Sequence, residues 1–267
     1  MSGDELGPAH CPVLPWPGNV FSPGINGGAL VKITWLGHAC FLVEDARGTK
    51  VVADPFEVGP ELLANHPGLR FEYPPIRGVK ADLVLVSHEH FDHNAAGVVS
   101  GSPAVVREPG DYRVAGVAVR AVPGEHDREG GRLAGPNLLL RWEMDGLALC
   151  HGGDFGQKAL RPEQKEALEP VDILFLPVGG DPQTGRPTVD AAGARAMVAM
   201  LAPRLVIPMH YATPAVNFLH PVEPFLDVME RVELVESNVL EVSPARVREL
   251  PTTVFVLKPP VKEGAWR

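Results

Sequence analysis

The stretch that decides the fold is Ser87-His88-Glu89-His90-Phe91-Asp92-His93, directly after the apolar run at 82–86. The run predicts a buried strand, and the string begins where this strand ends. Because alternate side chains of an extended segment point the same way, His88 and His90 can converge on one metal ion. Asp92 and His93 close the string at the point where the chain turns away, so they can face a second ion nearby. Imidazole and carboxylate groups together suit zinc and similar first-row ions.

Four ligands cannot complete two metal sites, but three further strand ends offer residues of the same types. His126, Asp154 and His210 each follow, by three or four residues, an apolar run that predicts a strand. Taken alone, either histidine could be an ordinary surface or core residue, and Asp154 a turn residue. Loops at strand ends often carry sites because a rigid scaffold holds them. Together with the string they predict a centre of two cations and seven ligands: His88, His90, Asp92, His93, His126, Asp154 and His210.

The composition is that of a globular protein without a disulfide framework. Its 267 residues suit one large domain or two small ones, and 45% of them are hydrophobic. A net charge of −9 argues against sequence-independent nucleic-acid binding, which needs a basic face. The three cysteines are widely spaced, no apolar run approaches about 18 residues, and the acidic N-terminus lacks the features of a signal peptide. We therefore expect a cytoplasmic protein without membrane contact, and the sequence leaves a homo-oligomer open.

The chain divides into a Pro- and Gly-rich extended arm at 1–29 and a single domain at 30–267. Three short apolar runs between 31 and 53 predict antiparallel strands. The segment at 55–80 is too long for a routine connection, which makes it a candidate lid. Two runs of strands, each followed by helices, predict two packed sheets with helices outside. The further strands are predicted at 82–86, 104–107, 117–122, 138–142, 147–150, 171–176, 204–207, 239–242 and 253–257, and the helices at 161–169, 188–201 and 222–232.

Four shorter motifs accompany the string: TWLGHA at 34–39, DP at 54–55, HGGD at 151–154 and PMHY at 208–211. With them, the chain resembles the metallo-β-lactamase superfamily from about residue 30 to 213. Within it, the chain is most similar to the metal-dependent hydrolases related to ascorbate-6-phosphate lactonase. Three features depart from that pattern and bear on the substrate: the long 55–80 segment, Ala212 in place of an asparagine, and the unmatched 214–267.

The resemblance implies an α/β (α+β) fold, an αββα sandwich of two mixed sheets with helices on the outer faces and the metals at one sheet edge. It implies two zinc ions per chain, with Mn2+ or Fe2+ as other choices. Asp92 then counts as a catalytic residue as well as a ligand. The first ion would bind His88, His90 and His126 and the second Asp92, His93 and His210, with Asp154 as the bridge.

Four other residues in the motifs are candidates for roles around the metals. Asp54 could accept a hydrogen bond from a ligand imidazole and fix its tautomer, or be a simple turn residue. His38 and His151 could contact substrate or give a proton to the leaving group, or be structural histidines. Tyr211 could orient the substrate or belong to the core.

Two metals about 3.5–4 Å apart can hold a shared hydroxide and polarise the substrate. Such a net cationic centre favours an ester, lactone or phosphoester bond in a small anionic metabolite. His90 stands where flavin-linked diiron oxygen reductases of the superfamily carry glutamate, which disfavours redox chemistry. Asp154 stands where antibiotic-hydrolysing members commonly carry cysteine, which disfavours β-lactamase activity.

Two alternatives stay open beside this hydrolase. RNA-processing relatives use the same ligand set, so the chain could be a phosphodiesterase or nuclease, although its acidic charge argues against nucleic acid as a partner. It could also be a catalytically silent metal-binding regulatory module, whose expected mark would be a missing ligand. Fold alone does not choose among these functions.

Overall fold

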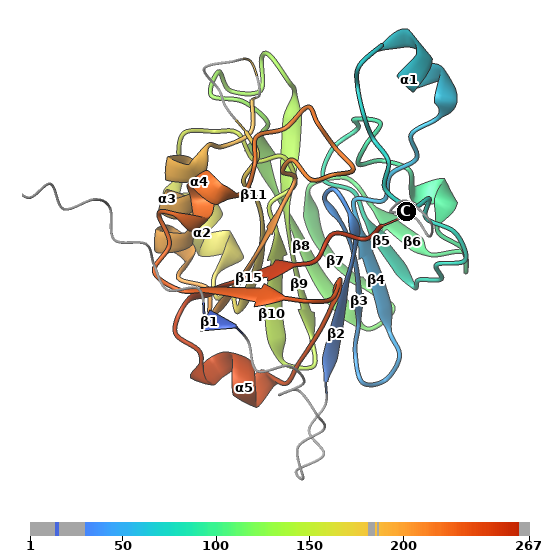
Figure 1. The fold of residues 1–267 in the computed structure, drawn as a ribbon. Coiled ribbons are helices and arrows are strands. Elements are labelled where there is room, and N and C mark those ends of the chain that lie inside the picture. The colour runs from blue at the N-terminus through green and yellow to red at the C-terminus, as the bar shows by residue number, and fades with distance from the viewer. Residues whose placement is uncertain (1–13, 16–29, 181–184, 186, 262–267) are drawn as a thin grey trace, which may run out of the picture.

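Two β-sheets pack face to face in the computed structural model, which describes residues 14–15, 30–180, 185 and 187–261 (Figure 1). The predicted two-sheet sandwich is confirmed. The nine-stranded sheet has the order β1 (Leu14–Pro15), β13 (Val232–Val235), β15 (Thr253–Leu257), β12 (Leu205–Met209), β11 (Ile173–Pro177), β10 (Leu147–His151), β9 (Pro136–Met144), β8 (Val117–Glu125) and β7 (Gly110–Val114). The six-stranded sheet has the order β14 (Val239–Val242), β2 (Val31–Gly37), β3 (Cys40–Glu44), β4 (Lys50–Ala53), β5 (Leu83–Leu85) and β6 (Ala104–Val106).

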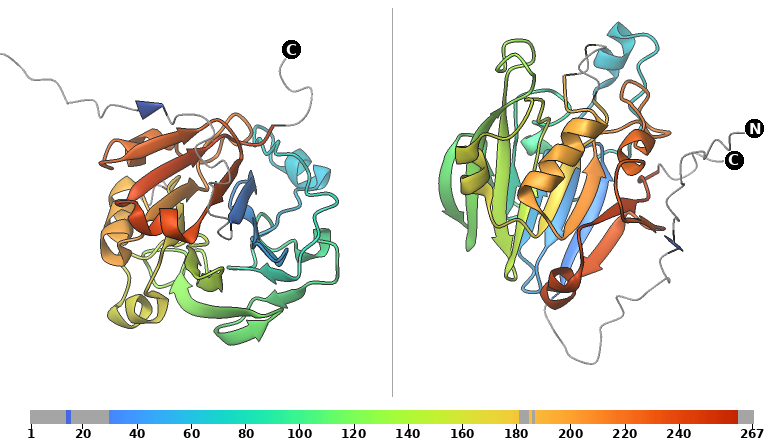
Figure 2. Two further views of the ribbon diagram at one scale, coloured as in Figure 1. Left: turned by 90° about the horizontal axis from the view of Figure 1, so that it is seen from below. Right: turned by 90° about the vertical axis from the view of Figure 1, so that its left-hand side faces the viewer.

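The helices are few and lie outside the sheets. Figures 1 and 2 show α2 (Pro162–Leu168), α3 (Ala191–Leu201) and α4 (Glu223–Leu226) on the side of the nine-stranded sheet. The helix α3 begins at Asp190, whose side chain accepts a hydrogen bond from Gly193 N at 2.9 Å, as expected of a helix cap. The remaining helices are α1 (Pro60–Asn65), the 3-10 turn η1 (Ala96–Val98) and α5 (Pro244–Glu249).

In the six-stranded sheet, alternate residues of a strand face the core between the sheets. Val51 and Ala53 of β4 belong to the inter-sheet cluster, whereas Val52 between them belongs to a second cluster on the opposite face. Phe41 of β3 and Phe175 of β11 meet across the two sheets with ring centroids 4.5 Å apart. The two-residue side-chain period of a strand therefore buries both faces of the six-stranded sheet.

The 55–80 segment supplies four of the twelve buried residues of the second cluster, so it forms part of the layer over this sheet. Phe56, Phe71, Tyr73 and Ile76 are buried against the sheet face that carries Val52. Helices cover the outer face of the nine-stranded sheet, whereas this largely irregular segment, which includes α1, packs on the outer face of the other.

The predicted helix at 222–232 is wrong in its extent. Only Glu223–Leu226 is helical, and by Val232 the chain has already entered the strand β13. Val254 N donates to Arg231 O at 2.9 Å, so pairing with β15 overrides the amphipathic pattern. The strands β7 and β13 and the helices α1 and α5 are not among the predicted elements. Of the predicted arm at 1–29, Leu14–Pro15 pairs with β13, while most of it lies outside the described residues. None of the described helices has the length and apolar character needed to span a bilayer.

Candidate active site

Four strands of the nine-stranded sheet run in the same direction and end at one edge. The strands β10, β11 and β12 are mutually parallel, and β8 points the same way because it is antiparallel to β9, which is antiparallel to β10. His126 follows β8, Asp154 follows β10 and His210 follows β12. The topology thus delivers three of the predicted ligands to one rim.

The string supplies the other four from the facing sheet, where it follows β5. It turns at once, with His93 N donating to His90 O at 2.9 Å. His88 and His90 come together with His126, and their ligand atoms lie within 4.8 Å of one another. The His88 Nε2 to His90 Nδ1 distance is 3.1 Å. Two ligands each about 2.1 Å from a common ion are about 3.0–3.4 Å apart at ordinary coordination angles, so this spacing fits one ion.

A second set of ligand atoms gathers beside the first. Asp92, His93 and His210 lie together, again within 4.8 Å, and His38 joins them as a fourth member. The His93 Nε2 to Asp92 Oδ2 distance is 3.8 Å. Both predicted three-residue sets are therefore assembled by the fold.

Asp154 lies between the two sets. Its Oδ2 is 3.0 Å from His126 Nε2 and 3.1 Å from His210 Nε2. Its Oδ1 is 3.5 Å from His93 Nε2. One carboxylate thus contacts a histidine of each set, which is the place of a bridging ligand.

Two buried atoms at this point lack a hydrogen-bond partner among the described residues, namely His93 Nε2 and Asp154 Oδ1. Buried polar atoms are normally paired because desolvation without a partner is costly. Burial alone lowers the pKa of His93, but the Asp154 and Asp92 carboxylates more than offset this and raise it to about 10. The site favours positive charge at this point, and a divalent cation satisfies both atoms. The donor set therefore fits metal ions.

Asp54 holds the ligand imidazoles from behind and is fully buried. Its Oδ2 accepts from His93 Nδ1 at 2.9 Å and from Ser87 Oγ at 2.6 Å, while its Oδ1 accepts from Ser87 N at 2.7 Å. Ser87 Oγ also lies 2.9 Å from His88 Nδ1, which can donate to it. These contacts match a carboxylate that accepts from Nδ1 of His93 directly and is linked to Nδ1 of His88 through Ser87, with Nε2 of both rings turned toward the ligand sets.

Three non-glycine residues of the centre adopt left-handed backbone conformations: His38 (φ 53°), Asp54 (φ 45°) and His210 (φ 51°). This region costs about 1–2 kcal/mol for a residue with a Cβ. Strained residues cluster where the surrounding structure fixes a functional geometry. Gly153, before Asp154, also has a positive φ of 55°, and a Cβ there would collide with Ser87 and Asn137.

The structure separates the remaining candidates. His38 Nε2 lies 2.9 Å from Asp92 Oδ2, and the ring is fully buried behind the second set. His151 Nε2 donates to Ala39 O at 2.8 Å, and its Nδ1 accepts from Gly153 N at 3.1 Å. Both nitrogens of this buried ring therefore have backbone partners among the described residues. Tyr211 is buried in the inter-sheet core, with its ring 5.6 Å from that of Trp35.

Sequence reasoning missed two residues that position the ligands. Asn137 Oδ1 accepts from Asp154 N at 2.9 Å, and Asn137 Nδ2 donates to Gly152 O at 2.9 Å. The Asp127 carboxylate accepts from four backbone N–H groups of the loop 129–134. Asp127 is adjacent to His126 and could have been noticed, whereas Asn137 is 17 residues from Asp154 and gave no local signal.

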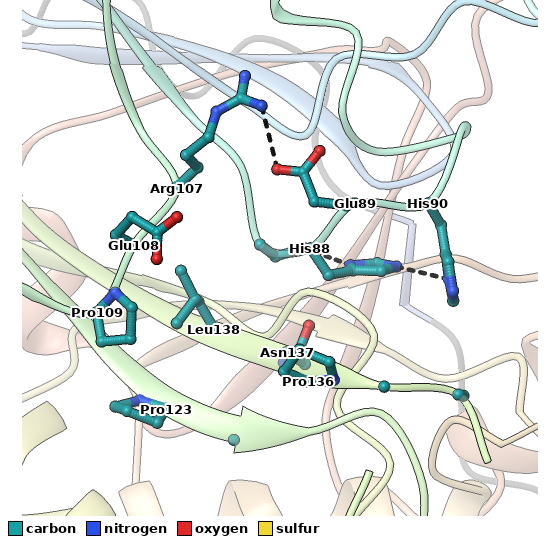
Figure 3. A pocket seen from close by; sticks show the side chains of 14 residues that line it. His88, Glu89, His90, Arg107, Glu108, Pro109, Pro123, Pro136, Asn137 and Leu138 are labelled. Carbon is teal, nitrogen blue, oxygen red and sulfur yellow. Dashed lines mark hydrogen bonds and ion pairs between the residues drawn. The ribbon is translucent and has the colours of Figure 1, made fainter. Parts of the chain in front are cut away.

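Two cavities flank the centre and share His90. A pocket of about 390 Å³ opens over Asp154 and His210, with Leu69, Phe91, Phe218 and Leu219 in its wall. A groove of about 520 Å³ lies on the other side of His88 and His90. Figure 3 shows Arg107 pointing toward Glu89 above this groove, with Pro109, Pro123 and Pro136 around it.

Comparisons with known proteins agree with this geometry. The family model of the beta-lactamase superfamily domain matches residues 32–210 of the sequence. A UPF0173 metal-dependent hydrolase of Thermococcus kodakarensis is 31% identical over 212 residues, 69% of this chain and 86% of that protein. One from Pelotomaculum thermopropionicum is 32% identical over 251 residues, 82% of this chain and 100% of that protein.

A solved structure from Thermotoga maritima, described as a candidate Zn-dependent hydrolase of the metallo-β-lactamase superfamily, superposes with a TM-score of 0.67 and 34% identity, covering 87% of this chain and 100% of that one. The sandwich with histidines and aspartates at its strand ends thus defines the class as a metallo-β-lactamase fold. The chain belongs to the metallo-β-lactamase superfamily, alongside the UPF0173 proteins, and is a metal-dependent hydrolase.

Proposed function

We propose that the centre holds two divalent ions, zinc by its donor set, and hydrolyses an ester, lactone or phosphoester bond of a small molecule with an anionic oxygen at the scissile group. The observation that carries this proposal is the position of Asp154, whose carboxylate contacts His126 of one ligand set and His210 of the other. A mononuclear site would not need a carboxylate at this point. When bound, two ions supply an ionised water as nucleophile and positive charge for the developing oxyanion.

The chain's own residues would prepare the site for this chemistry. Burial lowers the pKa of His88 to about 3, so its ring is neutral and offers a lone pair. Asp92, Asp154 and Asp54 bring three buried negative charges, so two divalent cations and one hydroxide would make the centre about neutral. The cations would stabilise an anionic oxygen that develops on the scissile group. We further propose that His38 orients Asp92 and that Asp54 fixes the tautomers of His88 and His93.

The test is hydrolysis of a panel of lactones, carboxylic esters and phosphodiesters by protein loaded with zinc or manganese, with metal content measured in parallel. We expect about two ions per chain, turnover of at least one substrate class, and loss of turnover in His126→Ala and His210→Ala. His66→Ala removes an exposed histidine outside the centre and is the matched control. Two bound ions with no turnover on the whole panel would instead indicate a silent binding module. Preference for nucleic acid would indicate a nuclease.

A further inference from the structure

Apart from the ligand residues, the described wall of the 390 Å³ pocket is largely apolar. Leu69, Phe91, Phe218 and Leu219 line the 390 Å³ pocket. Phe91 is 41% exposed although it belongs to the ligand string, so a large apolar ring faces solvent beside the residues proposed to bind metal. Because Phe91 lines the pocket, its exposed ring can contact a ligand bound there.

This wall is held in place by the fold. Asn217 Nδ2 donates to Gly68 O at 2.8 Å, and Arg70 N donates to Asn217 Oδ1 at 2.8 Å. One amide side chain therefore binds the backbone on both sides of Leu69. Because Asn217 precedes Phe218, the same contact fixes Leu69 near Phe218. The phenyl ring of Phe218 also stacks on Phe71, with centroids 6.4 Å apart.

Among the described residues of the two walls, cationic side chains that could bind a phosphate or a second carboxylate are scarce. Among the described residues that line either cavity, Arg107 is the one lysine or arginine. Its Nη1 is 3.1 Å from Glu89 Oε1, and Glu108 lies in the same rim (Figure 3). The described rim of the groove is therefore net negative. Three prolines in the groove wall add ring surface and no backbone N–H donors.

We infer that the substrate is a carboxylic ester or lactone with an apolar acyl group, which occupies the pocket of Leu69, Phe91, Phe218 and Leu219. This inference rests on the proposed hydrolase function and narrows it. Negative charge on the substrate is then confined to the scissile group at the metals, and the rest of the molecule is bound by apolar contact. A multiply charged phosphorylated metabolite would find no unpaired cation in the described walls.

The first experiment measures kcat/KM of the zinc-loaded protein for p-nitrophenyl acetate, butyrate and hexanoate. Each methylene that becomes buried should raise kcat/KM about three- to four-fold. Leu69→Ala and Phe218→Ala should flatten this rise by lowering the hexanoate value more than the acetate value. Leu234→Ala removes an equally sized, 41% exposed side chain on β13 and is the matched control. Asn217→Ala should weaken the rise less than Leu69→Ala does.

The second experiment needs no turnover. Calorimetric titration of the zinc-loaded protein with acetate, butyrate and hexanoate should show Kd tightening along the series, and tightening less in Phe218→Ala. Equal kcat/KM values along the ester series together with equal Kd values along the carboxylate series would overturn the inference. A higher kcat/KM for a phosphorylated ester than for p-nitrophenyl hexanoate would also overturn it. If no ester is hydrolysed but carboxylate binding still tightens, the pocket assignment stands and the hydrolase proposal fails.

Discussion

Replacing Asp54 with asparagine tests how the buried carboxylate prepares the metal ligands. Asp54 Oδ2 accepts from both His93 Nδ1 and Ser87 Oγ, while Oδ1 accepts from Ser87 N. An asparagine has one acceptor oxygen and one NH2 group. In either orientation of the amide, a donor faces a donor. If the NH2 group faces His93, the ring proton must move to Nε2, which is the atom that would bind metal.

The magnitude follows from these contacts. Loss of such a partner typically lowers metal affinity by about 10- to 100-fold. At a fixed free-metal concentration this removes about 1.4–2.7 kcal/mol of the stabilisation by metal. One unpaired buried donor costs the metal-free protein about 1–3 kcal/mol. For a chain of this size we expect the melting temperature without metal to fall by about 3–10 °C.

The assay is competition with a chelator for zinc, together with thermal melting with and without metal. Asp45→Asn is the matched control, because Asp45 is also buried and accepts backbone hydrogen bonds from Arg47 and Thr49, in a turn far from the centre. It should lower stability and leave zinc affinity unchanged. Zinc affinity of Asp54→Asn within two-fold of the wild type would refute the tautomer argument.

Three other changes give sharp expectations. His38→Ala removes the group 2.9 Å from Asp92 Oδ2, so the affinity for the second ion should fall about ten-fold while the first ion stays; unchanged stepwise zinc titration would speak against this role. Gly153→Ala should unfold the loop before Asp154 or strongly lower the melting temperature of the protein, because the added Cβ would collide with Ser87 and Asn137. A melting temperature equal to that of the wild type would contradict this collision. Burial alone raises the pKa of Asp45, but the N–H groups of Thr49 and Arg47 and the Arg47 guanidinium lower it overall. The stabilisation from this carboxylate is therefore present above pH about 4 and is lost as the pH falls through its folded-state pKa. Asp45→Asn should reduce the acid dependence of the melting temperature, and an unchanged dependence at acid pH would argue against this role.

Much of the fold was readable because its strands obey local rules. The Asp145-Gly146 pair predicted the hairpin between β9 and β10, and both residues have positive φ, as a tight hairpin turn requires. The parallel strands read as continuous apolar runs because both of their faces are buried. The helix α5 was also within reach, since Ser243 caps it and Pro244 occupies its first turn.

Other features depend on contacts between distant residues. The strand β13 forms because β15 pairs with it, and no periodicity within Val232–Val235 indicates this pairing. The choice between a turn and a ligand-holding role for Asp54 rests on contacts with Ser87 and His93, which lie 33 and 39 residues away. Likewise, His151 and Tyr211 sit in motifs like those around ligands, and only their packing reveals buried structural positions.

The most direct measurement is X-ray diffraction from crystals grown with zinc, with anomalous data collected on both sides of the zinc edge. The account predicts two anomalous peaks about 3.5–4 Å apart, one among His88, His90 and His126, the other among Asp92, His93 and His210, with Asp154 between them. A single peak at full occupancy, or two peaks with Asp154 bound to neither or to only one, would contradict it.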